Sequence, residues 1–304
     1  MTKRRMLAMA IALVLVVAQA AGCAGGSSSG GKAVIKIGAQ NYTEPIVLAH
    51  MLKILIEHDT DLKAETVEGL GATTVLHQAM LNNEVQISAS RYVGTDLTGA
   101  MGVNDPIRDP AQAMQMVQKG FADKFQQKWY DGYGFENTYA FAVREDMAKE
   151  RGYEKVSDLA KDAGNLTLGV DTDWLERPAD GYGAFTKEYF KFGKTVPMDI
   201  GLVYKALADK KMDVVLAYST DGRIQSFHLK TLADDKHFFP PYQASPVARM
   251  DILQKYPELD KTIQKLVGKI DTKTMTSLNY EVDEGGKSAD EAARDFLQKA
   301  GLLN

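Results

Sequence analysis

The stretch AVIKIGAQNYTEPIVLAHMLKILIEH, residues 33–58, decides the fold class of this chain. Residues 34–39 form a short apolar run of strand length, and residues 44–58 form a helix-length segment in which apolar side chains recur. The same alternation of strand-length and helix-length segments continues to the C-terminus. An alternating order of this kind predicts an α/β protein with mostly parallel sheets.

Outward from this unit, the pattern predicts the remaining elements. Further strands are expected at 64–67, 85–89, 138–143, 166–170, 213–218 and 243–247. Further helices are expected at 73–81, 111–126, 183–190, 201–208 and 289–300.

Two interruptions suggest that the chain passes twice between two domains. Glycines break the segment 131–137 just before a predicted strand, and two prolines stiffen the segment 238–242. We therefore expect one lobe built from 33–136 and 240–304, and a second, inserted lobe at 137–239. A two-lobed body of this kind places its ligand site in the cleft between the lobes.

The N-terminus has the layout of a secretory signal. Residues 3–5 are Lys-Arg-Arg, and residues 6–22 are apolar and end in small residues before Cys23. We expect a lipoprotein signal peptide at 1–22, lipidation at Cys23 and a flexible Gly/Ser tether at 23–32. An uncleaved anchor helix with a buried cysteine is the alternative.

Composition excludes several classes of function. Removing the three basic residues of the signal from 36 Lys and Arg leaves 33 against 40 Asp and Glu, a net charge near −7 that argues against a nucleic-acid partner. The single cysteine forbids an intrachain disulfide and a Cys-based metal framework. No two of the five histidines stand three or four residues apart, and no GxSxG, HExxH or Walker sequence occurs. We expect no enzyme activity, no cofactor and no metal, and a secreted hydrolase is the rival from another functional class.

Six segments carry a resemblance to a known family. They are GAQNYTE (38–44), GLGATTVLHQ (69–78), GFENTYAFAVR (134–144), LERPADG (175–181), AYSTDGRI (217–224) and DDKHFFPPY (234–242). In this order the chain resembles the substrate-binding lipoproteins of osmoprotectant ABC transporters, which take up glycine betaine, carnitine or choline.

The resemblance implies a fold and a set of site residues. The fold is the two-lobed periplasmic-binding-protein fold (type II), with mixed sheets flanked by helices. Family members hold a trimethylammonium head in a box of tyrosines, and an Arg with polar neighbours holds the other end of the solute. The matching box residues are Tyr92, Tyr139, Tyr218 and Tyr242, with Asn137 beside them where some relatives carry an acidic residue. The matching tail residues are Arg177, Thr95 and Gln40.

The chemistry agrees with these roles. A quaternary ammonium has no N–H to donate, so attraction to aromatic faces is the practical means of binding it. A carboxylate tail suits the planar fork of Arg177. Gln40 stands where relatives carry Lys, and its uncharged amide admits choline, whose tail is a hydroxyl.

Each of these residues also has a structural interpretation. Other tyrosines could replace one member of the box, namely Tyr42, Tyr130, Tyr133 and Tyr182. Arg177 could instead form an ion pair with Glu176 or Asp180. Thr73 and Thr74 lead into a helix, where they either face the cleft or serve as an ordinary helix cap.

The expected partners follow from the family. They are a quaternary-ammonium ligand, an ABC permease with its cytoplasmic ATPase, and the outer face of the cell membrane through the lipid anchor. We expect a monomer. The nearer rival function is a binding protein for another small cation or an amino acid, which predicts acidic residues rather than tyrosines around the ammonium.

Overall fold

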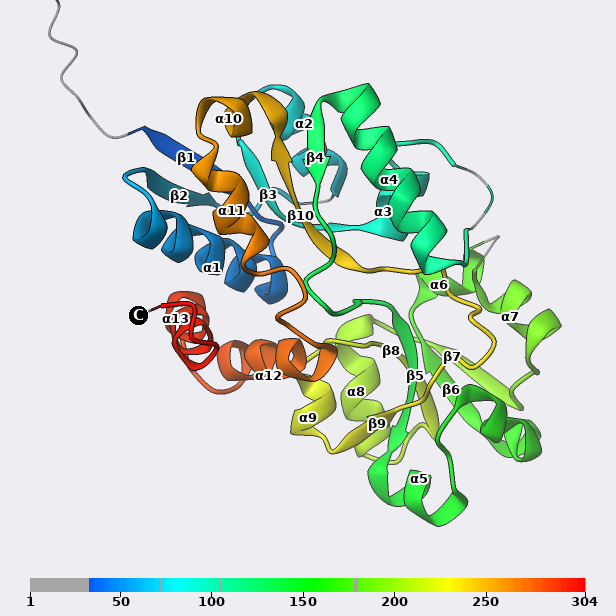
Figure 1. Cartoon of the computed structure of the whole chain (residues 1–304). Coiled ribbons are helices and arrows are strands. Elements are labelled where there is room, and N and C mark those ends of the chain that lie inside the picture. The colour runs from blue at the N-terminus through cyan, green and yellow to red at the C-terminus, as the bar shows by residue number, and fades with distance from the viewer. Residues whose placement is uncertain (1–32, 72, 104, 106, 178–179, 304) are drawn as a thin grey trace, which may run out of the picture. The chain divides into compact units, whose positions relative to one another are not determined.

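The computed structural model describes residues 33–303 except 72, 104, 106 and 178–179 (Figure 1). The predicted signal peptide (1–22), the lipidation site Cys23 and the tether (23–32) lie outside the described residues. None of the helices within the described part combines the length and the apolar character that a membrane crossing requires.

The first sheet has five strands in the order β2-β1-β3-β10-β4. Strands β2, β1 and β3 run parallel, whereas β10 pairs antiparallel with both β3 and β4. The strands are β1 (Val34–Gly38), β2 (Lys63–Val67), β3 (Ile87–Tyr92), β4 (Gln127–Trp129) and β10 (Ala244–Arg249).

Helices cover both faces of this sheet because its strands are apolar on both sides. Ile35, Ile37 and Ile87 pack in one buried cluster with α1 and the C-terminal helices, and Val247 packs in a second cluster with α2, α3 and α4. The helices are α1 (Thr43–Asp59), α2 (Thr73–Leu81), α3 (Val93–Thr98), α4 (Pro110–Phe125), α10 (Met250–Lys255), α11 (Glu258–Gln264), α12 (Thr272–Asp283) and α13 (Ala289–Lys299).

The second sheet repeats this arrangement, with the order β7-β6-β8-β5-β9. Along β8 the side chains alternate between faces, since Val214 and Leu216 join one buried cluster while Val215 and Ala217 join another. The strands are β5 (Tyr139–Arg144), β6 (Thr167–Val170), β7 (Lys194–Pro197), β8 (Val214–Tyr218) and β9 (Leu229–Thr231). The α-helices are α5 (Glu145–Arg151), α6 (Thr172–Glu176), α7 (Tyr182–Glu188), α8 (Ile200–Ala208) and α9 (Arg223–Ser226), and short 3₁₀ helices follow at Val156–Lys161 and Ala163–Asn165.

The chain leaves the first sheet after β4 and returns to it before β10. The two connecting segments run antiparallel and are bridged, since the Asn137 amide donates to the Tyr242 carbonyl at 3.2 Å and the Ala244 amide to the Phe135 carbonyl at 3.2 Å. The strand order fits two passages, and the exact lobe limits 33–136, 240–304 and 137–239 stay predictions.

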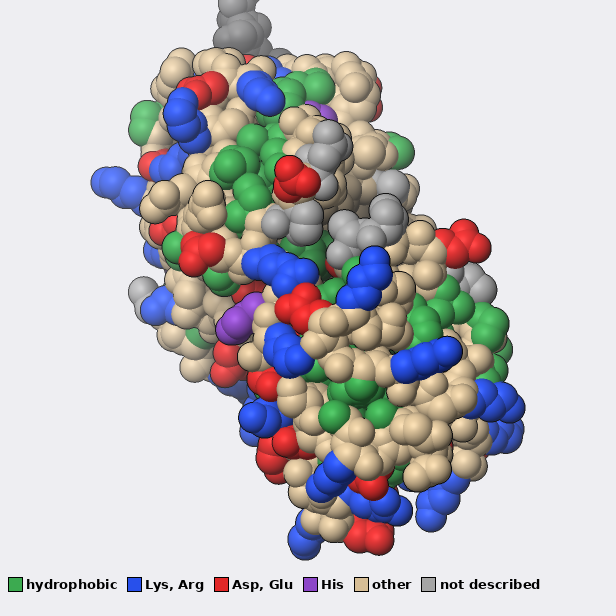
Figure 2. All heavy atoms as spheres, turned by 90° about the vertical axis from the view of Figure 1, so that its right-hand side faces the viewer, with side chains coloured by type: hydrophobic (Ala, Val, Ile, Leu, Met, Phe, Trp, Pro, Cys, Tyr) green, Lys and Arg blue, Asp and Glu red, His purple; other side chains and the backbone are tan. Residues whose placement is uncertain are grey.

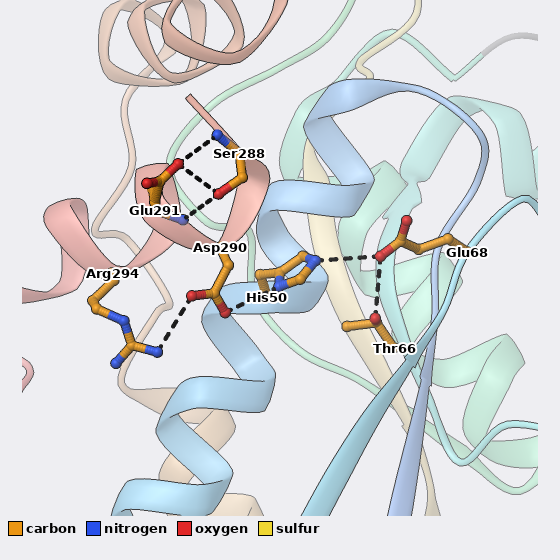
Figure 3. Close-up of polar contacts among 7 residues, drawn as sticks. All are labelled: His50, Thr66, Glu68, Ser288, Asp290, Glu291 and Arg294. Carbon is orange, nitrogen blue, oxygen red and sulfur yellow. Dashed lines mark hydrogen bonds and ion pairs between the residues drawn. The ribbon is translucent and has the colours of Figure 1, made fainter. Parts of the chain in front are cut away.

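The C-terminal helix α13 is tied to α1 by polar contacts (Figure 3). His50 on α1 lies between Glu68 and Asp290, with Nε2 3.2 Å from Glu68 Oε1 and Nδ1 3.4 Å from Asp290 Oδ1. Ser288 and Glu291 form a capping box at the start of α13. These contacts hold the end of the chain against the helix that begins at the site described below.

The structure confirms an α/β fold with mixed sheets. The expectation of mostly parallel sheets is wrong, because each sheet has two parallel and two antiparallel pairings among its described strands. The structure also adds elements that the pattern did not predict. The strands β4, β7 and β9 have only three or four residues, too few for a period to be recognised. Helix α12 has the polar sequence TKTMTSLNYEVD and buries only Met275, Leu278 and Asn279. Its apolar positions are too few to predict a helix from the sequence.

One face of the molecule is shown in full in Figure 2. Lys and Arg side chains lie interspersed with Asp and Glu over the coloured part of this face. The coloured part of this face therefore presents no continuous basic surface.

Candidate functional site

A cavity of about 780 Å³ lies where strands of both sheets end. All ten residues predicted for the ligand site line it: Gln40, Thr73, Thr74, Tyr92, Thr95, Asn137, Tyr139, Arg177, Tyr218 and Tyr242. The structure thus brings together residues that are up to 202 positions apart, from Gln40 to Tyr242. Their role in binding a ligand stays a prediction.

Strand ends place the tyrosines around this cavity. Tyr92 is the last residue of β3, Tyr139 the first of β5 and Tyr218 the last of β8. Because β5 and β8 run antiparallel with Tyr139 opposite Tyr218, their rings stack with centroids 5.3 Å apart at an interplanar angle of 27°. The two rings form one continuous aromatic wall.

Tyr242 lines the same cavity and lies on the second connecting segment. Gly94 in α3 lies directly against it, since a Cβ at position 94 would be 2.9 Å from the Pro241 carbonyl oxygen and 3.1 Å from the Tyr242 ring. The Gly94 amide also donates to the Pro241 carbonyl at 2.9 Å. Burial and the nearby Asp180 carboxylate raise the pKa of Tyr242 to about 12, so its hydroxyl stays protonated at neutral pH.

Arg177 is held in a fork-to-fork ion pair with Asp180. Its Nε and Nη2 donate to the two Asp180 oxygens at 2.7 Å each, and Nη2 also reaches the Tyr242 hydroxyl at 3.3 Å. The guanidinium carbon lies 5.8 Å from the centroid of the Tyr139 ring. The ion pair with Asp180, one of the two interpretations of Arg177, is therefore present, and it sets Arg177 at the cavity wall.

Gln40 and Thr95, predicted to bind the solute's tail, and the possible cleft residues Thr73 and Thr74 belong to or follow elements of the first sheet's lobe. Gln40 follows β1 and is buried, and its Nε2 donates to the Ser90 carbonyl at 3.4 Å while its Oε1 has no hydrogen-bond partner. Thr95 lies half-buried in α3. Thr73 and Thr74 are the first two residues of α2, so they reach the cavity as part of a helix N-terminus.

The sequence left several cavity residues unpredicted. Tyr42 is predicted only as a substitute for another tyrosine of the box. The cavity residues without any prediction are Thr43, Glu44, Gly71, Thr98, Thr220, Asp221, Arg223, Asn279 and Asp283. Most of them belong to the same family segments, where proximity to a predicted residue was the available signal. Asn279 and Asp283 had no such signal because α12 was not predicted.

Glu44, in the first turn of α1, is one of the two most buried of these residues, with Thr220. It is 2% exposed, and its Oε1 accepts hydrogen bonds from the Tyr92 hydroxyl at 2.5 Å and from Asn137 Nδ2 at 3.2 Å. The Tyr42 hydroxyl in turn donates to the Tyr92 hydroxyl at 2.7 Å. Glu44 therefore orients one ring of the predicted box through a direct bond and a second aromatic ring through Tyr92.

Helix α12 brings the C-terminal region to the cavity. Asn279 Nδ2 donates to the Thr220 carbonyl at 2.7 Å, and a Cβ at Gly222 would be 2.7 Å from the Tyr280 amide nitrogen. This close approach requires glycine at 222 and presses the loop after β8 onto α12.

The chemistry of the cavity is that of a binding site. Within the described residues, no group of three or more His, Cys, Asp or Glu could hold a metal ion. Aromatic rings, one buried carboxyl and two paired arginines face a space large enough for a small solute. Such a set can surround a cation and bind a polar tail.

Comparison with known proteins agrees with this description. Residues 33–299 match the family described as the substrate binding domain of ABC-type glycine betaine transport system. The chain is 54% identical over 276 residues to the carnitine transport binding protein OpuCC of Listeria monocytogenes, covering 90% of this chain and 88% of the relative. It is 31% identical to a glycine-betaine-binding protein of Pseudomonas aeruginosa, covering 89% of each chain.

A solved structure extends the likeness to three dimensions. The crystal structure of a glycine betaine/carnitine/choline ABC transporter protein superposes with a TM-score of 0.86 at 50% identity, covering 89% of this chain and 100% of that chain. This likeness confirms the two-lobed periplasmic-binding-protein fold expected from the six segments. The chain therefore belongs to the family of substrate-binding domains of ABC-type glycine betaine transport systems.

Proposed function

We propose that this chain is the extracytoplasmic solute-binding component of an ABC importer and that it captures a quaternary-ammonium solute such as glycine betaine, choline or carnitine. The observation that carries the proposal is the aromatic wall. Tyr92, Tyr139, Tyr218 and Tyr242 line one cavity, and no lysine is found among the described residues that line it. Tyrosine rings attract a methylated cation through their negative faces and pack against its methyl groups.

Arg177 is the residue proposed to contact the solute's tail. Its Nε and Nη2 are engaged by Asp180, so a carboxylate would approach the remaining Nη1 edge of the guanidinium. Thr95 and Gln40 are proposed to help, and the Gln40 Oε1 atom without a partner suits a ligand that brings a donor. This arrangement accepts a hydroxyl tail as well as a carboxylate.

Calorimetric titration tests the proposal directly. The mature protein, beginning at Cys23, would be titrated with choline, glycine betaine and carnitine, and with proline and spermidine as contrasting solutes. We expect one molecule of a quaternary-ammonium solute to bind per chain, without chemical turnover. Heat from spermidine or proline, with none from the three methylated cations, would instead support a binding protein for another small cation or an amino acid.

We also propose that Cys23 carries a lipid that holds the protein at the outer face of the membrane, where it delivers solute to a permease with a cytoplasmic ATPase. The support is the signal-like segment before Cys23 and the Gly/Ser stretch after it. Cys23→Ser should move the protein from the membrane fraction to the soluble extracytoplasmic fraction without altering solute affinity. Equal membrane retention of both proteins would show that the anchor lies elsewhere.

A further inference from the structure

Within the described part of the chain, Glu44 forms no ion pair, whereas Arg177, Arg223 and Asp221 of the same cavity each do. Arg177 is paired with Asp180, and Arg223 is paired with Asp221 through Nε at 2.9 Å and Nη2 at 2.6 Å. Glu44, by contrast, receives only hydrogen bonds from uncharged groups. A buried carboxylate without a counter-ion is costly, so such a group either binds a proton or acquires a cation.

Burial, together with an oxygen that has no donor, favours a proton on Glu44. Oε1 accepts from Tyr92 and Asn137, whereas Oε2 is buried and has no donor. Asn279, whose side chain lies against this carboxyl, also has a buried Oδ1 without a donor. A proton bound to Glu44 Oε2 would turn one of these two acceptor oxygens into a donor. Burial raises the pKa of Glu44. The hydrogen bonds from Tyr92, Thr220, Asn137 and Asn279 lower this pKa again only in part.

The other groups that line the cavity are mostly uncharged at neutral pH. Tyr42 and Tyr92 have pKa values raised by burial, and Asn137, Thr220 and Asn279 do not titrate. Three charged residues line the same cavity from the loop after β8, from α9 and from α12, and they are Asp221, Arg223 and Asp283. Asp221 is neutralised by its bidentate pair with Arg223, and Asp283 accepts a hydrogen bond from the Thr43 hydroxyl. None of these groups supplies Glu44 with a dedicated positive charge.

We propose that the bound solute is the missing cation: Glu44 holds a proton while the cavity is empty, and it releases this proton to the solvent as a quaternary ammonium enters. The inference rests on the proposed function of the same site. On release, the O–H bond of the carboxyl breaks, its electron pair stays on the oxygen, and the carboxylate faces the ligand's positive charge. Binding of the cation and loss of the proton are thus linked.

The physical reason lies in the ligand's chemistry. A methylated ammonium offers no N–H, so Glu44 cannot recognise it by hydrogen bonding, but a charge in a poorly solvated cavity acts on the carboxyl over several ångströms. An opposite charge favours the ionised form of a carboxyl. The Tyr42–Tyr92–Glu44 chain adds to this, because hydroxyls that donate toward a carboxylate place more negative charge on rings that face the cation.

The linkage between proton release and cation binding determines how the affinity for choline changes with pH. A proton bound to the empty protein competes with the cation, so the affinity for choline should rise with pH as Glu44 of the empty protein becomes ionised, by up to about tenfold per pH unit, and then level off. Glycine betaine and carnitine carry the same cationic head and should show the same trend.

The test is calorimetry of choline binding between pH 5 and pH 9 in phosphate and in Tris, two buffers with very different enthalpies of ionisation. Below the plateau, the wild-type protein should give a buffer-dependent heat that corresponds to a released proton. Glu44→Gln keeps an acceptor for Tyr92 and adds a donor toward Asn279, so it should fold, bind choline with an affinity independent of pH, and give the same heat in both buffers. Choline's neutral isostere 3,3-dimethyl-1-butanol, at concentrations high enough to bind, should release no proton from either protein.

Glu136 provides the matched control. It is the other described carboxyl whose pKa burial raises, and it does not line the cavity. Glu136→Gln should keep the buffer-dependent heat. Loss of that heat in Glu136→Gln, or its retention in Glu44→Gln, would overturn the inference. So would a wild-type protein whose choline affinity is independent of pH, while the proposed function would still stand. If no methylated cation binds the wild-type protein at any pH, the proposed function itself fails.

Discussion

Tyr218 ends β8 with its ring stacked on Tyr139, and each ring of the wall is expected to contribute about 0.5–2 kcal/mol to cation binding. Tyr218→Leu removes one aromatic face, so it should weaken choline binding about tenfold or more. Tyr218→Phe keeps the ring and should cost less than about tenfold by the same argument. Calorimetric titration of both variants checks the order. Leu and Phe variants with equal affinity would show that the ring of Tyr218 does not face the ligand.

Arg177 should distinguish solutes by their tails. Arg177→Ala removes a charge-assisted contact worth about 1.5–3 kcal/mol to a carboxylate, so it should weaken glycine betaine more than choline. The loss also leaves Asp180 without its partner in a buried position, which affects both ligands alike. The ratio of the two dissociation constants is therefore the informative quantity. An unchanged ratio would assign Arg177 to the Asp180 ion pair alone.

At the scale of elements, α3 positions the Tyr242 segment through Gly94. Gly94→Ala places a Cβ 2.9 Å from the Pro241 carbonyl oxygen, so the segment must shift and carry Tyr242 with it. We expect choline affinity to fall several-fold, measured by titration. Gly183→Ala in α7 is the matched control, since its Cβ would meet nothing within 4 Å, and it should leave affinity unchanged. Equal behaviour of the two variants would contradict the role given to Gly94.

The start of α13 is capped by the side chains of Ser288 and Glu291. Ser288 Oγ accepts a hydrogen bond from the Glu291 amide at 3.2 Å, and the Glu291 carboxylate accepts one from the Ser288 amide at 2.9 Å (Figure 3). Ser288→Ala should lower the free energy of unfolding by about 1 kcal/mol, whereas Ser288→Asp restores a good cap and should recover most of it. Chemical denaturation of the three proteins measures the difference. Full stability of the Ala variant would mean that the packing of α13 on α1 outweighs its cap.

At the scale of the whole chain, the cavity is incomplete in either lobe alone. Tyr92 ends a strand of the first sheet and Thr95 lies in the helix after it, Tyr139 and Tyr218 belong to the second sheet, and Tyr242 lies on a connecting segment. A ligand that contacts all of them favours the closed arrangement over an open one, and this difference in affinity drives closure. Small-angle scattering should therefore show a smaller radius of gyration with saturating choline than with proline. An identical radius with both solutes would argue against ligand-driven closure.

The sequence by itself determined the fold class and predicted ten residues that line one cavity. Short apolar runs alternating with helix-length segments predicted an α/β protein, because burial on both faces of a sheet needs continuous apolar strands between covering helices. Six segments identified the family, and the ten predicted site residues, eight of them within these segments, all line one cavity. These are local features, carried by residue types and their order, so they can be recognised without coordinates.

The tertiary structure alone decided how charge is arranged in that cavity. Glu44 looked like an ordinary residue of a helix's first turn until folding buried it against Tyr92 and Asn137, from two other elements. Asn279 reached the cavity on α12, a polar helix with too few apolar residues to predict from the sequence. Burial and counter-charge depend on which distant segments pack together. Neighbours in space, and not neighbours in sequence, therefore determine whether a carboxyl holds its proton.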